Sequence, residues 1–288
     1  MPFITWKYKR LILQDISRGL REIHEKNVIH RDLHSGNILL KTRRNDRKWY
    51  IGDLGLSQPV DNTPLNNEIY GVIPYIAPEI YKGVKFSKES DIYSLGMIMW
   101  ELTSCRKPFD NLEHDHKLIY KIIDGKRPEI THDTPECYAN LMKRCWNPDP
   151  SKRPLITEIC KSIDFWLLFW NHQTFNDSEE KRLKLIQSTK FYSEFIKEPH
   201  PKAVYMRRTL SIMTKESNKS SSSSSILSNT GQEYISRDQE YDINDIQRIS
   251  AAINFSKKRN IDELKAKNPS NHGKRYKIDD NIDPKFKD

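Results

Sequence analysis

The chain has 288 residues, a formal net charge of +9, 30% charged residues and a mean hydropathy of −0.78. Its apolar runs are too short to cross a bilayer, and residues 1–6 lack the charged, apolar and cleavage regions of a signal peptide. The sequence therefore predicts a cytoplasmic protein, with the nucleus as an alternative, and no membrane partner. Four cysteines without a C-x-x-C pair favour reduced structural thiols over a zinc or redox site.

The first predicted element is a helix that begins after Thr5 and ends near Asn27. Within it, Ile12, Ile16, Leu20 and Ile23 recur at helical spacing and form one apolar stripe. Three short apolar runs follow, at residues 28–29, 38–40 and 49–51, and polar turns separate them as they would separate short strands. Residues 41–48 are strongly charged, and we expect them to form a solvated hairpin loop.

The segment from Ser90 to Thr103 is apolar nearly all round, which is typical of a helix buried on every side. Further helices are predicted at about 113–124, 135–146 and 155–170, with prolines between them. The fold class expected from these elements is mainly α, with a few short β-strands, over residues 1–170.

The composition changes after about residue 172, where Ser, Asn, Lys, Asp and Glu dominate and Ser220–Ser225 is an uninterrupted serine run. Such a stretch buries too little apolar surface to offset the entropy of ordering, so residues 171–288 are predicted to be a mostly disordered, basic tail. A short helix near 243–254 is an alternative within it. Solvated charge in the tail explains the net positive charge better than a nucleic-acid partner does, because the sequence has no row of basic residues with aromatic residues spaced along it.

Five short motifs follow one another along the first part of the chain. They are His30-Arg31-Asp32-Leu33-His34-Ser35-Gly36-Asn37, Asp53-Leu54-Gly55, Ala77-Pro78-Glu79, Asp91-Ile92-Tyr93-Ser94-Leu95-Gly96 and Pro150-Ser151-Lys152-Arg153-Pro154. The first matches H-R-D-x-x-x-x-N at its four fixed positions, the second resembles D-F-G with leucine for phenylalanine, and the third matches A-P-E. In this order the motifs resemble the C-terminal lobe of eukaryotic protein kinases, in particular the tyrosine-kinase-like branch.

The resemblance implies roles for several residues in ATP-dependent phosphoryl transfer to a protein hydroxyl. Asp32 would orient the hydroxyl and accept its proton, and Asp53 and Asn37 would hold Mg²⁺ on the phosphates of ATP. Leu39 would lie beneath the adenine ring. Arg31 would contact a phosphate on the segment between residues 53 and 79.

Other matched residues would have supporting roles. The resemblance implies that His30 and Leu54 stack in an internal apolar column and that Asp91 holds the backbone of the catalytic loop. It also implies that Glu79 pairs with Arg153.

Two linked departures concern the acceptor side of the site. His34 stands where Ser/Thr-type kinases have a lysine two residues after the catalytic aspartate, and Val72 stands where they have a threonine. In the family both residues approach the catalytic aspartate, so the choice between Ser/Thr and Tyr hydroxyls stays open. Because histidine is mostly neutral at pH 7, His34 could also weaken transfer.

A third departure concerns the nucleotide. Only 29 residues precede His30, and the chain contains no G-x-G-x-x-G and no strand lysine before Asp32. We expect an N-terminally truncated kinase domain at residues 1–170, whose tight binding of ATP and Mg²⁺ needs the missing N-terminal lobe and which is inactive alone. The alternative is a kinase-derived binding or regulatory module that transfers no phosphate and docks protein partners through its helical lobe and tail.

Overall fold

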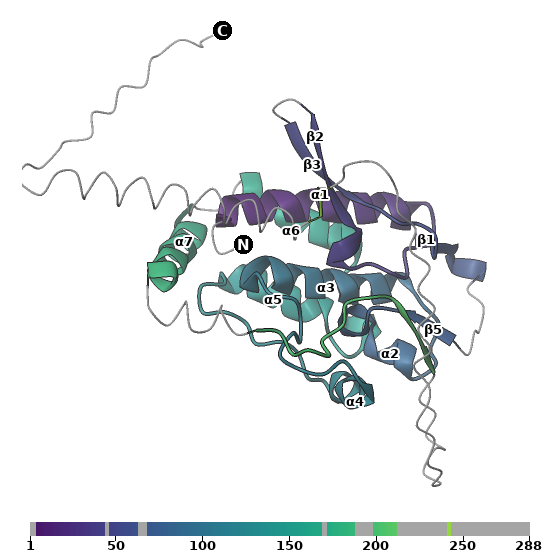
Figure 1. Ribbon diagram of the computed structural model, residues 1–288. Coiled ribbons are helices and arrows are strands. Elements are labelled where there is room, and N and C mark those ends of the chain that lie inside the picture. Colours follow the sequence, from purple (N-terminus) through teal and green to yellow (C-terminus); the bar gives the residue numbers. More distant parts are fainter. Residues whose placement is uncertain are drawn as a thin grey trace, which may run out of the picture. The chain divides into compact units, whose positions relative to one another are not determined.

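The computed structural model describes residues 4–43, 46–62, 68–168, 172–187, 198–211 and 241–242 (Figure 1). The helices are α1 (Trp6–Glu25), α2 (Pro78–Tyr81), α3 (Lys88–Ser104), α4 (His116–Ile123), α5 (Glu136–Cys145), α6 (Ile156–Leu168) and α7 (His172–Gln187). The strands are β1 (Val28–Ile29), β2 (Ile38–Arg43), β3 (Asp46–Ile51), β4 (Gln58–Pro59), β5 (Glu68–Gly71), β6 (Arg208–Ser211) and β7 (Tyr241–Asp242). The prediction of a mainly helical chain with a few short strands is confirmed for these residues.

Helix α1 begins where the sequence predicts. The Thr5 hydroxyl oxygen accepts a hydrogen bond from the Tyr8 backbone N–H at 3.3 Å, which caps the first turn. Ile12, Ile16 and Leu20 are fully buried and Ile23 is half-buried, so the predicted stripe is the face that packs into the core. Helix α6 lies alongside α1 (Figure 1).

Helix α3 is the centre of the helical core, and its residues 90–104 are all buried. It begins with a capping box in which Ser87 and Ser90 exchange side-chain and backbone hydrogen bonds. Gly96 lets α5 approach closely, because a Cβ at this position would meet the Cys145 Cβ at 3.0 Å. In the parts of the chain that the structure describes, no helix is long and apolar enough to cross a membrane.

The strands form small antiparallel pairs, with β1 on β4, β3 and β7 on either side of β2, and β5 on β6. Strands β2 and β3 form a twisted hairpin that projects from the helical core (Figure 1). Leu40 and Trp49 pair across it and are buried, whereas Lys41 and Lys48 pair on the opposite face. Most of the charged stretch at 41–48 is thus paired strand, so the predicted loop is wrong there. The alternation of buried and exposed side chains around Trp49 continues the pairing of β2 with β3 into this stretch.

Ordered structure continues beyond residue 170, where the sequence predicts a disordered tail. Helix α7 buries Phe175, which is 2% exposed and packs against Trp6 and Trp166 at ring distances of 6.2 and 6.0 Å. One buried aromatic side chain can anchor a polar helix, because its burial removes a large apolar area from water. The average composition of the segment does not reveal a single such residue. The serine run and the alternative helix at 243–254 lie outside the described residues.

The four cysteines are free thiols, as predicted. Cys145 and Cys160 are buried, and Cys105 and Cys137 are half-buried. Burial raises the pKa of the Cys145 thiol to about 12. This thiol is therefore protonated at neutral pH and unsuited to nucleophilic chemistry.

Candidate active site around Asp32 and Asp53

Asp91 at the start of α3 fixes the backbone of the loop that follows β1. Its carboxylate accepts hydrogen bonds from the backbone N–H of His30 at 2.8 Å and of Arg31 at 3.0 Å. The same carboxylate lies 2.9 Å from Nε2 of the buried His24. Arg31 has a φ of 70°, a left-handed conformation that is unfavourable for arginine, and the two backbone bonds to Asp91 hold it there. The predicted contact of Asp91 with this loop is confirmed.

Asp32 and Asn37 lie within the same loop and are joined to each other. Asp32 is 3% exposed, and its backbone N–H donates to Nδ1 of His30 at 3.3 Å. The Asn37 Nδ2 donates to the backbone oxygen of Asp32 at 2.8 Å. Because its amide nitrogen is engaged in this way, Asn37 has its side-chain oxygen left for a further ligand.

Asp53, two residues after the end of β3, brings a second carboxylate to the same place. Its φ is 52°, and its Oδ1 accepts a hydrogen bond from the Gly55 N–H at 3.1 Å. The Nη2 atom of Arg207 donates to Asp32 Oδ2 at 2.5 Å and to Asp53 Oδ2 at 2.7 Å. A single nitrogen thus reaches both carboxylates, which therefore converge on one point.

The carboxyl group of Asp32 is anionic over the whole neutral range. Burial raises its pKa, but the neighbouring His34 and Arg207 outweigh burial and lower the pKa to about 2. Anionic Asp32 can accept a hydrogen bond from a hydroxyl and thereby orient it.

His34 faces Asp32 from the position where the resembling family has lysine. Its Nε2 lies 3.6 Å from Asp32 Oδ2, which is longer than a hydrogen bond. Its Nδ1 accepts from the Gly36 N–H at 3.1 Å, so the Nε2 atom carries the ring proton and points to the carboxylate. Val72, at the position of the second departure, is 2% exposed and offers no hydroxyl.

A buried polar network beside the loop of residues 30–37 was not predicted from the sequence. The Tyr75 hydroxyl donates to Glu101 Oε2 at 2.6 Å and lies 3.2 Å from the hydroxyl of Ser35. Lys107 Nζ donates to Ser35 Oγ at 2.6 Å and pairs with Glu101 at 3.3 Å. Burial and the Glu101 charge raise the pKa of Tyr75 well above its usual value. The network ties this loop to α3 and to the segment after it, although its members are far apart in sequence.

The remaining predicted site residues lie around this centre. Arg31 stacks on Phe86 at 4.8 Å, and its Nη1 lies 3.5 Å from the Leu56 backbone oxygen. Leu39 on β2 is half-buried and pairs with Tyr50 in the hairpin. These contacts leave the phosphate role of Arg31 and the adenine role of Leu39 as predictions.

The predicted apolar column of His30 and Leu54 is wrong in this structure. His30 is fully buried and its Nε2 lies 3.1 Å from the Gly52 backbone oxygen, whereas Leu54 is 56% exposed. Burial of Leu54 needs apolar side chains on its outer face, and the described residues do not supply them.

Glu79 and Arg153 form the buried ion pair that the motif order implies. The two guanidinium Nη atoms donate to the two carboxylate oxygens at 2.6 and 2.7 Å. Their side chains are 9% and 0% exposed, respectively. This bidentate pair connects α2 to the loop before α6 across 74 positions of sequence.

The oxygen donors of the site fit a small hard cation. Magnesium is usually held by one or two protein oxygens together with phosphate oxygens and water. The Asp53 carboxylate and the Asn37 side-chain oxygen supply such donors, and the Arg207 position shows that a positive group fits between Asp53 and Asp32. Within the described ranges, no three or more His, Cys, Asp or Glu residues gather as metal ligands, so water or phosphate oxygens would complete the shell of a cation at this site.

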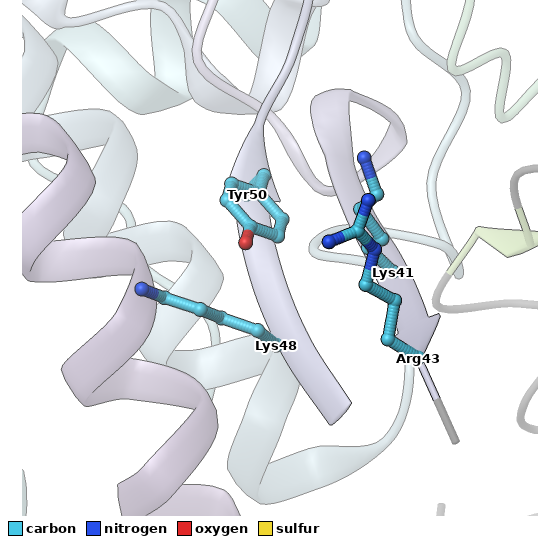
Figure 2. A pocket seen from close by; sticks show the side chains of 4 residues that line it. All are labelled: Lys41, Arg43, Lys48 and Tyr50. Atoms are coloured by element: carbon cyan, nitrogen blue, oxygen red, sulfur yellow. The ribbon is translucent and has the colours of Figure 1, made fainter. Parts of the chain in front are cut away.

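A second, basic surface lies on the β2–β3 hairpin. Figure 2 shows a pocket lined by Lys41, Arg43, Lys48 and Tyr50. It contains none of the predicted catalytic residues. Lys48 Nζ lies 5.7 Å from the centre of the Tyr50 ring, which is within range of a weak cation–π contact.

Comparison with known proteins connects the site to a family. The model for the protein tyrosine and serine/threonine kinase family matches residues 4–163. A probable LIM domain-containing serine/threonine-protein kinase of Dictyostelium discoideum is 33% identical over 53% of this chain and 23% of its own length. The probable serine/threonine-protein kinase roco8 of the same organism is 34% identical over 56% of this chain and 9% of its own length.

Mitogen-activated protein kinase kinase kinase 7 of Homo sapiens is 33% identical over 56% of this chain and 27% of its own length. The chain thus spans less than a third of each of these relatives. The matched residues 4–163 include the loop with Asp32, the segment with Asp53 and the Glu79–Arg153 pair. The chain belongs to the eukaryotic protein kinase family, and it is similar to the tyrosine-kinase-like branch.

Proposed function

We propose that this chain carries the catalytic lobe of a protein kinase that transfers the γ-phosphoryl group of ATP to serine or threonine hydroxyls of proteins. The observation that carries the proposal is the convergence of Asp32 and Asp53 on one nitrogen of Arg207, at 2.5 and 2.7 Å. The serine/threonine assignment rests on the names of the relatives, which are described as serine/threonine-protein kinases.

Each residue of the site has a task that follows from its chemistry. Asp32 accepts a hydrogen bond from the substrate hydroxyl, aims its oxygen and takes its proton. Asn37 and Asp53 provide the oxygens that would hold magnesium, which neutralises charge on the phosphates when it is bound. His34 presents its Nε2 proton toward Asp32 and so offers a donor beside the reacting hydroxyl.

A binding or regulatory module without phosphoryl transfer is the second candidate. The 288 residues contain no G-x-G-x-x-G, and a guanidinium occupies the point between the two carboxylates. Phosphoryl transfer is accelerated mainly by positioning of the reactants. A chain that leaves the phosphates of ATP uncovered therefore loses most of that acceleration. We therefore expect the 288 residues alone to transfer no measurable phosphate.

Phosphate transfer from labelled ATP and Mg²⁺ to a mixed protein substrate tests both candidates. The assay compares the 288-residue chain with the same chain preceded by the upper lobe of a related kinase, each with and without Asp32→Asn. Transfer by the fused chain that Asp32→Asn abolishes supports the kinase. If the fused chain folds but transfers nothing, also when it carries Arg207→Gln, the lobe is a binding module. Transfer by the 288 residues alone that Asp32→Asn abolishes contradicts the expected inactivity.

A further inference from the structure

Residues 198–211, here named the strap, lie against the same site although they are far from it in sequence. The strap begins on the loop between α3 and α4, where the His200 N–H donates to the Asp110 backbone oxygen at 2.7 Å. The His114 N–H donates to the Lys202 backbone oxygen at 3.1 Å, and a His114 ring nitrogen lies 2.9 Å from the Val204 oxygen. These backbone contacts fix the path of an extended peptide.

Tyr205 anchors the middle of the strap. Its hydroxyl donates to the Pro108 backbone oxygen at 3.0 Å, and its ring packs edge-on against His114 at 4.7 Å. Tyrosine suits such a position because its ring is partly buried while its hydroxyl keeps a partner. The neighbouring Met206 is 67% exposed, so the chain turns alternate side chains toward and away from the lobe.

The end of the strap adds a strand to the activation segment, which is the stretch between residues 53 and 79. Strand β6 pairs antiparallel with β5 in a register that places Tyr70 opposite Thr209 and Gly71 opposite Arg208 (Figure 1). Backbone pairing of this kind gives affinity with little demand on sequence and is a common mode of peptide recognition.

Between the Tyr205 anchor and β6, Arg207 is the residue that the strap presents to the site. Its Nε donates to Asp32 Oδ2 at 2.8 Å, and its Nη2 reaches both Asp32 and Asp53. The Arg207 side chain is 38% exposed, and the Asp32 side chain is 1% exposed. Arginine has no hydroxyl, so it fills the point where a substrate hydroxyl and a metal ion would approach and cannot itself accept a phosphoryl group through oxygen.

We propose that residues 198–211 act as an intramolecular pseudosubstrate, an extended peptide that occupies the protein-substrate surface and closes it with Arg207. The role of the strap as a pseudosubstrate rests on the proposed kinase function, but the contacts of the strap with Asp32, Asp53 and β5 do not depend on that function. Arg207 excludes a divalent cation from Asp53 by occupying the same oxygen, and β6 excludes a substrate peptide from β5 by occupying the same backbone groups. Release of the strap opens both sites together.

Hydrogen–deuterium exchange on the full chain tests the strap, with Arg207→Gln as the probe and Lys202→Gln as the matched control. Both variants remove one positive charge from the strap, but among the described residues the Lys202 side chain pairs with Glu113, at 2.9 Å, and not with Asp32 or Asp53. We expect slow exchange at the amides of β6 in the native chain and in Lys202→Gln. In Arg207→Gln the exchange should be about tenfold faster, because the three charge-assisted hydrogen bonds to Asp32 and Asp53 are lost.

Manganese binding, measured by its paramagnetic signal, provides the second readout. We expect the Arg207→Gln chain to bind Mn²⁺ about tenfold more tightly than the native chain, since the cation no longer competes with a guanidinium. Faster exchange in Arg207→Gln without Mn²⁺ binding by either protein supports the strap and contradicts the proposed function. Fast exchange at β6 in the native chain, or equal exchange in the native chain and Arg207→Gln, overturns the strap proposal whatever the metal does.

Discussion

The guanidinium of Arg207 makes two hydrogen bonds to one oxygen of Asp32, from Nε at 2.8 Å and from Nη2 at 2.5 Å. The two residues are separated by 175 positions in sequence. Charge-assisted bonds to a buried carboxylate are among the stronger contacts in a protein, so this one couples the strap to the loop that holds the proposed catalytic aspartate.

The coupling predicts an acid-sensitive contribution to stability. The pKa of Asp32 is lowered from 3.8 to about 2 in the folded chain, where burial opposes the shift and His34 and Arg207 produce it. A carboxyl group whose pKa is lowered on folding stabilises the fold fully at pH values above its unfolded-state pKa. This contribution is lost as the pH falls through the folded-state pKa, here between about pH 4 and about pH 2. The contribution is on the order of 2 kcal/mol and is shared by His34 and Arg207.

Urea unfolding of the native chain and of Arg207→Gln between pH 7 and pH 2 measures the share of Arg207. The difference between their free energies of unfolding should be constant above pH 4 and should shrink as the pH approaches 2. A difference that grows on acidification, or none at pH 7, contradicts the assigned cause.

Asp91 should be more important for the catalytic loop than its distance from the reacting atoms suggests. Asp91→Asn replaces one acceptor oxygen by a donor, so one of the buried donors of His24, His30 or Arg31 loses its partner. We expect a loss of about 2 kcal/mol in the free energy of unfolding, measured in urea. Asp164→Asn, at a half-exposed partner of Arg18, is the control and should cost less than about 1 kcal/mol. Equal costs for the two variants would be evidence against this role of Asp91.

The Glu79–Arg153 pair offers a second comparison of buried and exposed charge. Arg153→Ala leaves the Glu79 carboxylate buried without its guanidinium and should destabilise the chain by about 3–5 kcal/mol. Arg144→Ala breaks the pair with Glu158, whose side chains are 50% and 48% exposed, and should cost less than about 1 kcal/mol. Thermal unfolding of both variants measures the difference, and a cost for Arg153→Ala no larger than for Arg144→Ala would show that the buried pair is dispensable.

Phe175 tests whether α7 is part of the folded lobe. Phe175→Ala removes a ring that packs against Trp6 and Trp166 and stacks on Arg10 at 4.1 Å, and it should cost about 3 kcal/mol. Leu183→Ala on the same helix changes a side chain that is 45% exposed and should cost much less. Calorimetry distinguishes the two, and matching unfolding temperatures for Phe175→Ala and the native chain would place α7 outside the cooperative unit.

Local patterns predicted the parts of the fold that depend on neighbouring residues. The stripe of Ile12, Ile16 and Leu20 indicated α1, and the unbroken apolar stretch at 90–103 indicated the buried α3. The motif at 30–37 indicated, through its resemblance to the kinase family, a loop that holds both Asp32 and Asn37, and the Asn37 side chain bonds the Asp32 backbone oxygen.

Contacts over long sequence distances could not be predicted in the same way. The strap docks through backbone bonds and through side chains that include Tyr205 and Arg207, far along the chain from the residues they contact. Pairing of β5 with β6 brings together residues about 140 positions apart, and the average composition of the segment after residue 172 does not indicate such a contact. The motif match likewise placed Leu54 in an apolar column, but burial depends on the side chains that surround it, and Leu54 is 56% exposed.

The convergence of Asp32 and Asp53 is central to the proposed chemistry, and divalent-cation binding tests it most directly. The measurement is a Mn²⁺ titration of the Arg207→Gln chain and of the same chain with Asp53→Asn added. We predict that Mn²⁺ binds the first protein at one site and that the added Asp53→Asn weakens this binding by about tenfold or more, because a carboxylate ligand is lost. Equal binding by the two proteins, or no binding by the first, would contradict a metal site at these carboxylates.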